Sequence, residues 1–145
     1  MGEDGPVRVT MLLADHAVVA DGKLYLNGGG WTVTSPTTPP SSIALKFDVP
    51  WDQANVPIVT VLDLVDADGH PVHQPTADGT APVQIQARLE VGRPAGMPLG
   101  APIGAIVALG IPPLVLSPGQ RYTWRLHLDG QTRQDWELTF TTRPA

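Results

Sequence analysis

The sequence predicts an all-β fold, an antiparallel β-sandwich of about seven to nine strands that forms one domain over residues 1–145. Apolar and polar residues alternate with a period of two along most of the chain, which is the pattern of half-buried strands. The 15 glycines and 16 prolines are spread through the sequence and favour frequent turns. No window shows the period of about 3.6 residues that marks an amphipathic helix.

Four segments place apolar residues on one face and polar residues on the other, as a strand with one buried face does. They cover residues 43–49, 83–91, 122–128 and 136–141. Residues 58–65 differ, because apart from Thr60 and Asp63 they are apolar on both faces. This segment is therefore expected to be a central strand.

Asp-Gly pairs mark turns between the expected strands, because both residues accept the positive φ of tight hairpin turns. Four such pairs lie within the region of the expected strands: Asp21-Gly22, Asp68-Gly69, Asp78-Gly79 and Asp129-Gly130. The last pair lies between residues 120–128 and residues 135–142, so these two segments are predicted to pair as a hairpin.

The segment Pro118-Gly119-Gln120-Arg121-Tyr122-Thr123-Trp124 resembles the tyrosine corner that leads into a late strand of immunoglobulin-like domains. In such a corner the tyrosine hydroxyl bonds to backbone upstream, and the residue two positions later points into the core. We therefore expect an immunoglobulin-like sandwich with Trp124 buried. The usual disulfide is excluded, because the chain has no cysteine.

Three consecutive glycines, Gly28 to Gly30, precede Trp31 and could form either a ligand loop or a turn. A dinucleotide site needs a helix directly after its glycines, whereas residues 31–34 have the pattern of a strand and soon meet Pro36. The expected role is a glycine-rich bend where the chain changes sheets, with Trp31 packing in the core.

Residues 11–34, MLLADHAVVADGKLYLNGGGWTVT, are similar to the opening of a bacterial family of small uncharacterised proteins that is frequent in actinobacteria. Three elements carry the resemblance. They are Ala14-Asp15-His16-Ala17, the segment from Asp21 to Trp31, and the segment from Pro118 to Gly130. The resemblance extends over most of the chain and implies a β-sandwich, but it implies no activity.

Charge and composition exclude several classes of protein. The net charge is -5 and the nine Lys and Arg residues are scattered, so the chain offers no basic face for nucleic acid. No uninterrupted apolar run reaches the ~18 residues of a membrane span, and the acidic segment Met1–Pro6 lacks the apolar core of a signal peptide. We expect a cytoplasmic protein without a cofactor.

Two groups of polar residues could support metal binding or catalysis, and both have an ordinary explanation. Asp63, Asp66 and Asp68, followed by His70 and His73, imitate a metal loop, but no complete ligand set can be named and Asp68-Gly69 is already predicted as a turn. His127 and Glu137 share strand parity and could pair across the predicted hairpin. Because mixed polar residues are usual on an exposed sheet face, no metal ligand and no catalytic residue is assigned.

The segment from Pro94 to Gln120 contains no charged residue. One interpretation is a long loop followed by a buried strand near residues 103–110. The other is an apolar surface for a protein partner or a second copy, with the interface at Ile103, Ile106, Val107 and Leu109. If this strand lies at a sheet edge, its unpaired backbone groups would invite pairing, and the flanking prolines would favour a closed dimer.

These observations favour a non-catalytic binding or assembly module whose partner is another protein or a second copy of itself. The alternative is a sandwich that binds a small ligand or carbohydrate through exposed aromatic rings, with Trp31, Trp51 and Tyr25 as candidates. Open, coplanar rings would favour the ligand, and buried rings would favour the assembly module. An enzyme ranks third, because no Gly-x-Ser-x-Gly nucleophile motif occurs.

Overall fold

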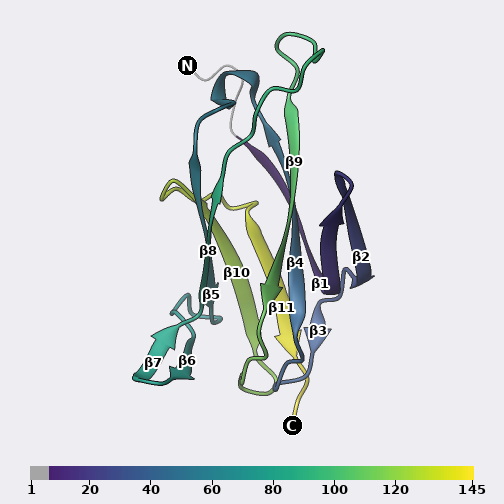
Figure 1. Ribbon diagram of the computed structural model, residues 1–145. Helices are drawn as coiled ribbons and strands as arrows, with labels where there is room; N and C mark the ends of the chain where they lie inside the picture. Colours follow the sequence, from purple (N-terminus) through teal and green to yellow (C-terminus); the bar gives the residue numbers. More distant parts are fainter. Residues whose placement is uncertain (1–6) are drawn as a thin grey trace.

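Figure 1 shows the computed structural model, which describes residues 7–145; the segment Met1–Pro6, where no signal peptide is expected, lies outside the described residues. The described chain is all-β, and it contains no helix long and apolar enough to cross a membrane. Its strands are β1 (Arg8–Ala20), β2 (Lys23–Gly29), β3 (Val33–Thr34), β4 (Ser41–Val49), β5 (Ile58–Val65), β6 (His73–Thr76), β7 (Gly79–Pro82), β8 (Gln84–Leu89), β9 (Ile103–Ile111), β10 (Arg121–Leu128) and β11 (Glu137–Thr142). A short 3₁₀-helix, η1 (Trp51–Gln53), follows β4.

Residues 7–145 contain eleven strands, more than the seven to nine expected, because the sequence pattern misses the short ones. β3 has two residues, and β6 and β7 have four each. β6 and β7 pair around Asp78-Gly79 as a separate two-stranded sheet. Elements this short contain too few residues for an alternation to be read.

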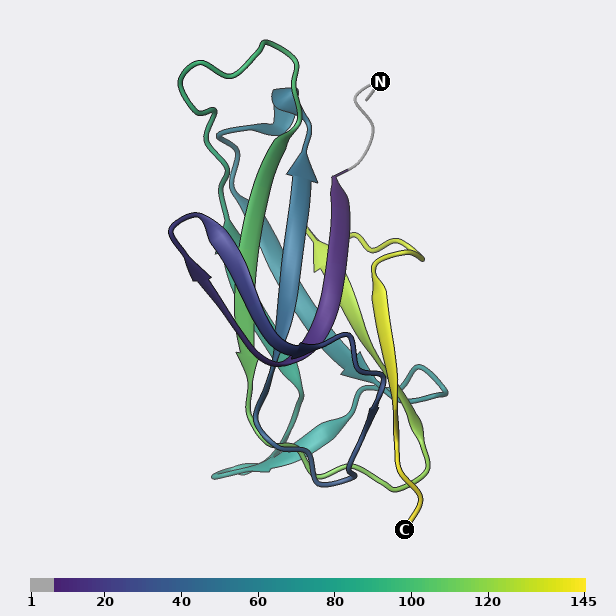
Figure 2. The same ribbon diagram turned by 90° about the vertical axis from the view of Figure 1, so that its right-hand side faces the viewer.

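The other strands form two larger sheets that face each other (Figures 1 and 2). The first has the order β2-β1-β4-β9, and the second has the order β3-β11-β10-β5-β8. Neighbouring strands are antiparallel, except that β3 runs parallel to β11. β5 lies inside its sheet between β10 and β8, as expected for a central strand.

The main core lies between these two sheets. β4 contributes Ile43, Leu45 and Phe47, and β10 contributes Trp124 and Leu126, each no more than 1% exposed. In β10 the buried residues are alternate ones, so the two-residue period gives this strand one apolar face, whereas in β4 Ser42 and Ala44 on the opposite face are buried as well. Removal of this apolar surface from water stabilises the packed sheets by about 25 cal/mol per Å².

The glycine run is the point where the chain passes from one sheet to the other. β2 ends at Gly29 in the first sheet, and β3 soon follows in the second. Gly28 and Gly30 have φ of 61° and 87°, and a Cβ at Gly28 would overlap the Asp15 carboxylate. Trp31 packs against the core directly after this crossing. The run is therefore a bend, as the sequence predicts.

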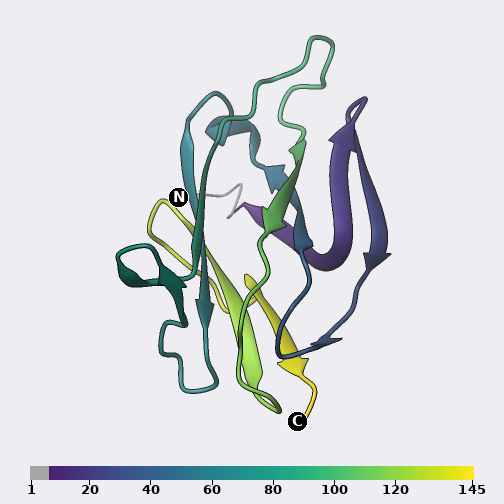
Figure 3. The same ribbon diagram turned by 60° about the horizontal axis from the view of Figure 1, so that its bottom comes forward.

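β1 takes part in two layers of the molecule. Residues 8–14 pair with β4, whereas residues 14–20 pair with β2 and curve over the outer face of the first sheet (Figures 2 and 3). A second, smaller apolar cluster lies beneath this hairpin. It consists of Ala14, Ala17 and Ala44, with Leu24, Leu26 and Ala108 packed against them. Small side chains on the sheet let the hairpin lie close to it.

β10 and β11 form the predicted hairpin, with Arg121 opposite Thr141 and Arg125 opposite Glu137. Asp129 and Gly130 have φ of 50° and 80°, as a tight turn of this kind requires. Between the turn and β11, residues 131–136 make an excursion that the alternation does not predict. This excursion forms one wall of a cleft at the end of the molecule.

Candidate functional site

β9 is a free edge strand of the first sheet. It pairs with β4 along its whole length, from Ile103 opposite Val49 to Ile111 opposite Ser41. Within residues 7–145, no backbone hydrogen bond joins β9 to any other segment. The N–H and C=O groups on the far side of β9 are therefore a template for a further strand.

β9 lacks the features that usually keep edge strands from associating, which are charges, prolines and bulges. Its sequence is IGAIVALGI, its register with β4 is continuous, and Pro102 and Pro112 stand just outside it. Two other edge strands carry a charge, Lys23 on β2 and Arg88 on β8, and the edge strand β3 has only two residues. β9 is thus an apolar, uncharged edge.

The four residues assigned to an interface lie on two faces of β9. Ile103 is only 2% exposed, and Val107 and Leu109 are partly buried against the core from the inner face. Ile106 lies on the outer face, opposite Lys46. An added strand would therefore meet the first three as a continuation of the core, and Ile106 as a continuation of the outer surface.

The three aromatic candidates do not form one stacking surface. Trp31 packs edge-to-face on Phe140, with ring centroids 6.1 Å apart. The Arg93 guanidinium covers the Trp51 ring at 4.3 Å from its centroid, and its Nη2 donates a 2.6 Å hydrogen bond to the Trp51 carbonyl oxygen. Tyr25 is 51% exposed on the β1–β2 hairpin. The rings thus belong to a sheet crossing, a 3₁₀-helix and a hairpin.

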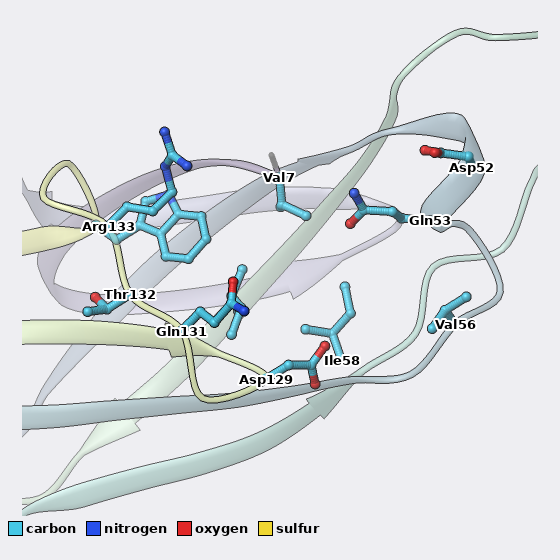
Figure 4. Close-up of a pocket in the computed structure, with 11 residues that line it drawn as sticks. Val7, Asp52, Gln53, Val56, Ile58, Asp129, Gln131, Thr132 and Arg133 are labelled. Atoms are coloured by element: carbon cyan, nitrogen blue, oxygen red, sulfur yellow. The ribbon is translucent and has the colours of Figure 1, made fainter. Parts of the chain in front are cut away.

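A cleft of about 420 Å³ lies where the β4–β5 connection faces the excursion after β10 (Figure 4). Its apolar lining consists of the exposed Val56 and of four buried side chains at the end of the core. These are Val7, Ile58, Leu128 and Trp136. Its polar lining includes Asp52 and Gln53 on one wall, and Gln131, Thr132 and Arg133 on the other. Sequence reasoning missed this cleft, because its two walls are loops distant in the chain.

Several polar groups of the cleft are already engaged by the protein. The Asp129 Oδ1 accepts a 2.9 Å hydrogen bond from the Val59 backbone N–H. Thr132 donates its hydroxyl proton to the Leu126 carbonyl oxygen at 2.7 Å. The Arg133 guanidinium lies 5.9 Å from the centroid of the Trp136 ring. These contacts fix the shape of the excursion and leave Asp52, Gln53 and Gln131 at the rim.

On the polar face of the second sheet, His127 and Glu137 do not form the pair that their shared strand parity would allow. His127 Nε2 lies 3.0 Å from the Asp63 Oδ2 on β5, and Glu137 instead accepts a 3.1 Å hydrogen bond from Arg125 Nε. Gln84 on β8 donates to the other Asp63 oxygen at 2.6 Å. The sequence could not indicate the observed pairs, because parity within one hairpin says nothing about β5, which lies on the other side of β10.

Asp66, Asp68 and His70 come close enough for their ligand atoms to lie within 4.8 Å of one another. The loop itself explains this cluster, because Asp66 Oδ1 accepts 2.9 Å hydrogen bonds from the backbone N–H groups of Asp68 and His70. Gly69, with φ of 80°, completes the turn. The carboxylate of Asp66 is thus a structural acceptor in this loop.

The fold and the edge together define an all-β protein of two facing sheets with a long, uncharged edge strand, β9. A family model matches residues 9–141, and this family is one of unknown function (DUF6941). Because the match covers most of the chain, the protein belongs to this family, and the match includes all three elements of the resemblance seen in the sequence. No curated protein and no solved structure matches the chain.

Proposed function

We propose that this protein is a non-catalytic binding or assembly module, an immunoglobulin-like sandwich that binds by adding a partner's strand to β9. The observation that carries the proposal is the nine-residue edge of β9, which is apolar, uncharged and unpaired within the described chain. In strand addition, main-chain hydrogen bonds supply affinity and alternate side chains supply specificity. The partner is therefore an extended apolar segment of a protein.

The inner face of β9 supports the same proposal. Ala105, Val107 and Leu109 pack against the core but remain partly exposed at its rim. A strand beside β9 would cover these side chains with residues of its own. Burial of that apolar surface favours association by about 25 cal/mol per Å², before the cost of ordering the partner is subtracted.

The proposal is tested with a labelled peptide that contains residues 103–111 between lysine flanks, its binding measured by fluorescence anisotropy. Wild-type protein is expected to bind it. Ile106→Glu should weaken binding at least about tenfold, because a carboxylate on the edge would be desolvated by the added strand. The new carboxylate would lie opposite Lys46 within its own sheet, so the fold is retained.

The matched control is Val59→Glu, which also exchanges an apolar residue for an acid opposite a cation. Val59 is 52% exposed and faces Arg88, but it belongs to the inner strand β5. Its peptide affinity should equal that of the wild type. Absence of peptide binding to the wild type, or equal binding to Ile106→Glu, would contradict strand addition at β9.

The second candidate function is binding of a small ligand or carbohydrate in the cleft of Figure 4. A volume of about 420 Å³, an apolar lining and a polar rim favour it, because ligand pockets are typically ~300–1,000 Å³ with this composition. The test is a thermal-shift screen with mono- and oligosaccharides. A sugar that raises the Tm of the wild type but not of Gln53→Ala/Gln131→Ala would support this function.

Catalysis ranks third. The Asp63–His127 pair is the arrangement most like a catalytic dyad, but it lies on the polar face of a sheet, outside the cleft lining. The two side chains are 32% and 25% exposed, and Asp63 is held by Gln84. An open sheet face gives a substrate no enclosure, whereas enzymes position reacting groups in sites that exclude water.

A further inference from the structure

We infer that the strand added to β9 is the β9 of a second copy of this chain. The two strands would run antiparallel about a two-fold axis at Val107, and the two four-stranded sheets would become one sheet of eight strands. This inference rests on the proposed function, because it needs an open β9 edge. It deepens that function by naming the partner and the register.

The face of the sheet to which each side chain of β9 points restricts the register between the two copies. Directly opposed residues of an antiparallel pair point to the same face of the sheet. Odd-numbered residues of β9 face the core, as Ile103 and Ile111 show, and even-numbered residues such as Ile106 face outward. For both cores to lie on one side of the joined sheet, odd residues must oppose odd residues. A two-fold axis that pairs odd residues with odd residues lies at a residue and not between two residues. When that residue is Val107, all nine residues of β9 are paired.

Side-chain sizes fit this register. On the outer face Ile106 would oppose Ala108, and Gly104 would oppose Gly110 of the other copy. On the inner face Leu109 would oppose Ala105, and the isoleucines at the two ends would oppose each other. A large residue thus meets a small one beside the axis on each face. No charge faces a charge, because β9 has none.

The pairing would close as a dimer. Each copy uses its β9 edge once, and a two-fold axis makes the same strand both donor and acceptor. Pro102 and Pro112 end the ladder on both sides, because proline has no N–H to donate. The outer edges of the joined sheet are the two β2 strands, and each carries Lys23, which discourages further growth.

The β1–β2 hairpin overlies the edge at which the second copy would add. It lies above the outer face of the first sheet, and its tip at Asp21-Gly22 extends past β9 in Figure 2. In the dimer, each tip would therefore lie over the outer face of the other copy. Val18, Val19 and Tyr25 on this hairpin are 40%, 44% and 51% exposed, and the second copy would cover part of that apolar surface.

The first experiment measures mass by sedimentation equilibrium from micromolar to millimolar protein. Wild type and Val59→Glu are expected to dimerise. Ile106→Glu should raise the dissociation constant at least about tenfold, because the introduced carboxylate would be buried opposite Ala108 of the other copy. Circular dichroism checks that both variants keep the β-fold.

The second experiment reads the register with single cysteines, which the natural chain lacks. A Cβ at Gly110 meets no atom within 4 Å, and one at Gly104 meets only the Asp48 carboxylate at 4.0 Å, so Gly104→Cys and Gly110→Cys should both fold. A mixture of the two variants should be joined by a short thiol cross-linker. Either variant alone should not, because its two thiols would be about 20 Å apart.

The outcomes separate this inference from the proposed function. A wild type that stays monomeric at millimolar concentration but still binds the lysine-flanked peptide would overturn the second copy and keep strand addition. A dimer that Ile106→Glu does not weaken would place the contact elsewhere. Cross-linking of Gly104→Cys alone, or of Gly110→Cys alone, would overturn the register at Val107.

Discussion

The backbone N–H of Ser117 donates a 2.9 Å hydrogen bond to the Tyr122 hydroxyl. This is the contact that the tyrosine-corner motif predicts, and it ties the start of β10 to the loop before it. Thr142 on β11 donates its hydroxyl proton to the Ser117 carbonyl oxygen at 2.6 Å. Both backbone groups of Ser117 are thus held by side chains of the second sheet.

Tyr122→Phe should lower the free energy of unfolding by about 1–2 kcal/mol, because it leaves the Ser117 N–H without its acceptor. The ring still stacks on Phe140, 5.8 Å between centroids, so the fold should remain. Urea denaturation measures the change. Tyr25→Phe is the matched control, since this exposed hydroxyl should contribute nothing measurable. Equal stability of the two variants would show that the corner is not stabilising.

Gly28→Ala should cost more stability than Gly22→Ala. Both glycines have positive φ, 61° and 71°, so both variants lose about 1 kcal/mol to backbone strain. Only at Gly28 would the new Cβ meet the Asp15 carboxylate; at Gly22 it meets no atom within 4 Å. Thermal unfolding should rank the variants in this order. Adding Asp15→Ala should restore part of the loss at Gly28, and a lack of any restoration would argue against the clash.

Asp66→Ala should destabilise the protein by about 1 kcal/mol or more, because it removes the acceptor of two backbone N–H groups. Asp68→Ala should change stability little, since Asp68 supplies only its backbone N–H to that carboxylate. Excess calcium or zinc should leave the Tm of the wild type unchanged, as binding to the native state would raise it. If calcium or zinc raises the Tm of the wild type, and this increase is lost in both Asp68→Ala and His70→Ala, the loop is a metal site instead.

Local patterns predicted much of the second sheet. Alternation over 122–128 and 136–141 gave two strands, and Asp129-Gly130 between them gave their pairing, because turn chemistry and strand period are properties of nearby residues. The segment 58–65, apolar on both faces apart from Thr60 and Asp63, was recognised as an inner strand for the same reason. Whether β9 lies at the edge of its sheet could not be predicted from the sequence, since strand order is set by contacts between distant segments.

Features formed by segments that are distant in the chain could not be predicted from the sequence. The partner of His127 is Asp63, 64 positions earlier on another strand, and no local rule selects it over Glu137. The cleft joins the β4–β5 connection to residues 131–136, two loops without a readable period. The folding of the β1–β2 hairpin over the sheet depends on small residues that three different strands supply, so no single strand reveals it.

The patch beneath that hairpin, formed by Ala14, Ala17, Ala44 and Ala108, has a consequence for how the molecule opens. Apart from Leu24 and Leu26, the side chains of this cluster are single methyl groups that bury little area, so the hairpin is held down more weakly than the strands of the main core are held together. It should therefore behave as a separate cooperative unit, whose amide hydrogens exchange with solvent through partial openings that leave β4 and β10 intact. The protein would then have a detachable outer layer, released at a lower free energy than the rest of the chain.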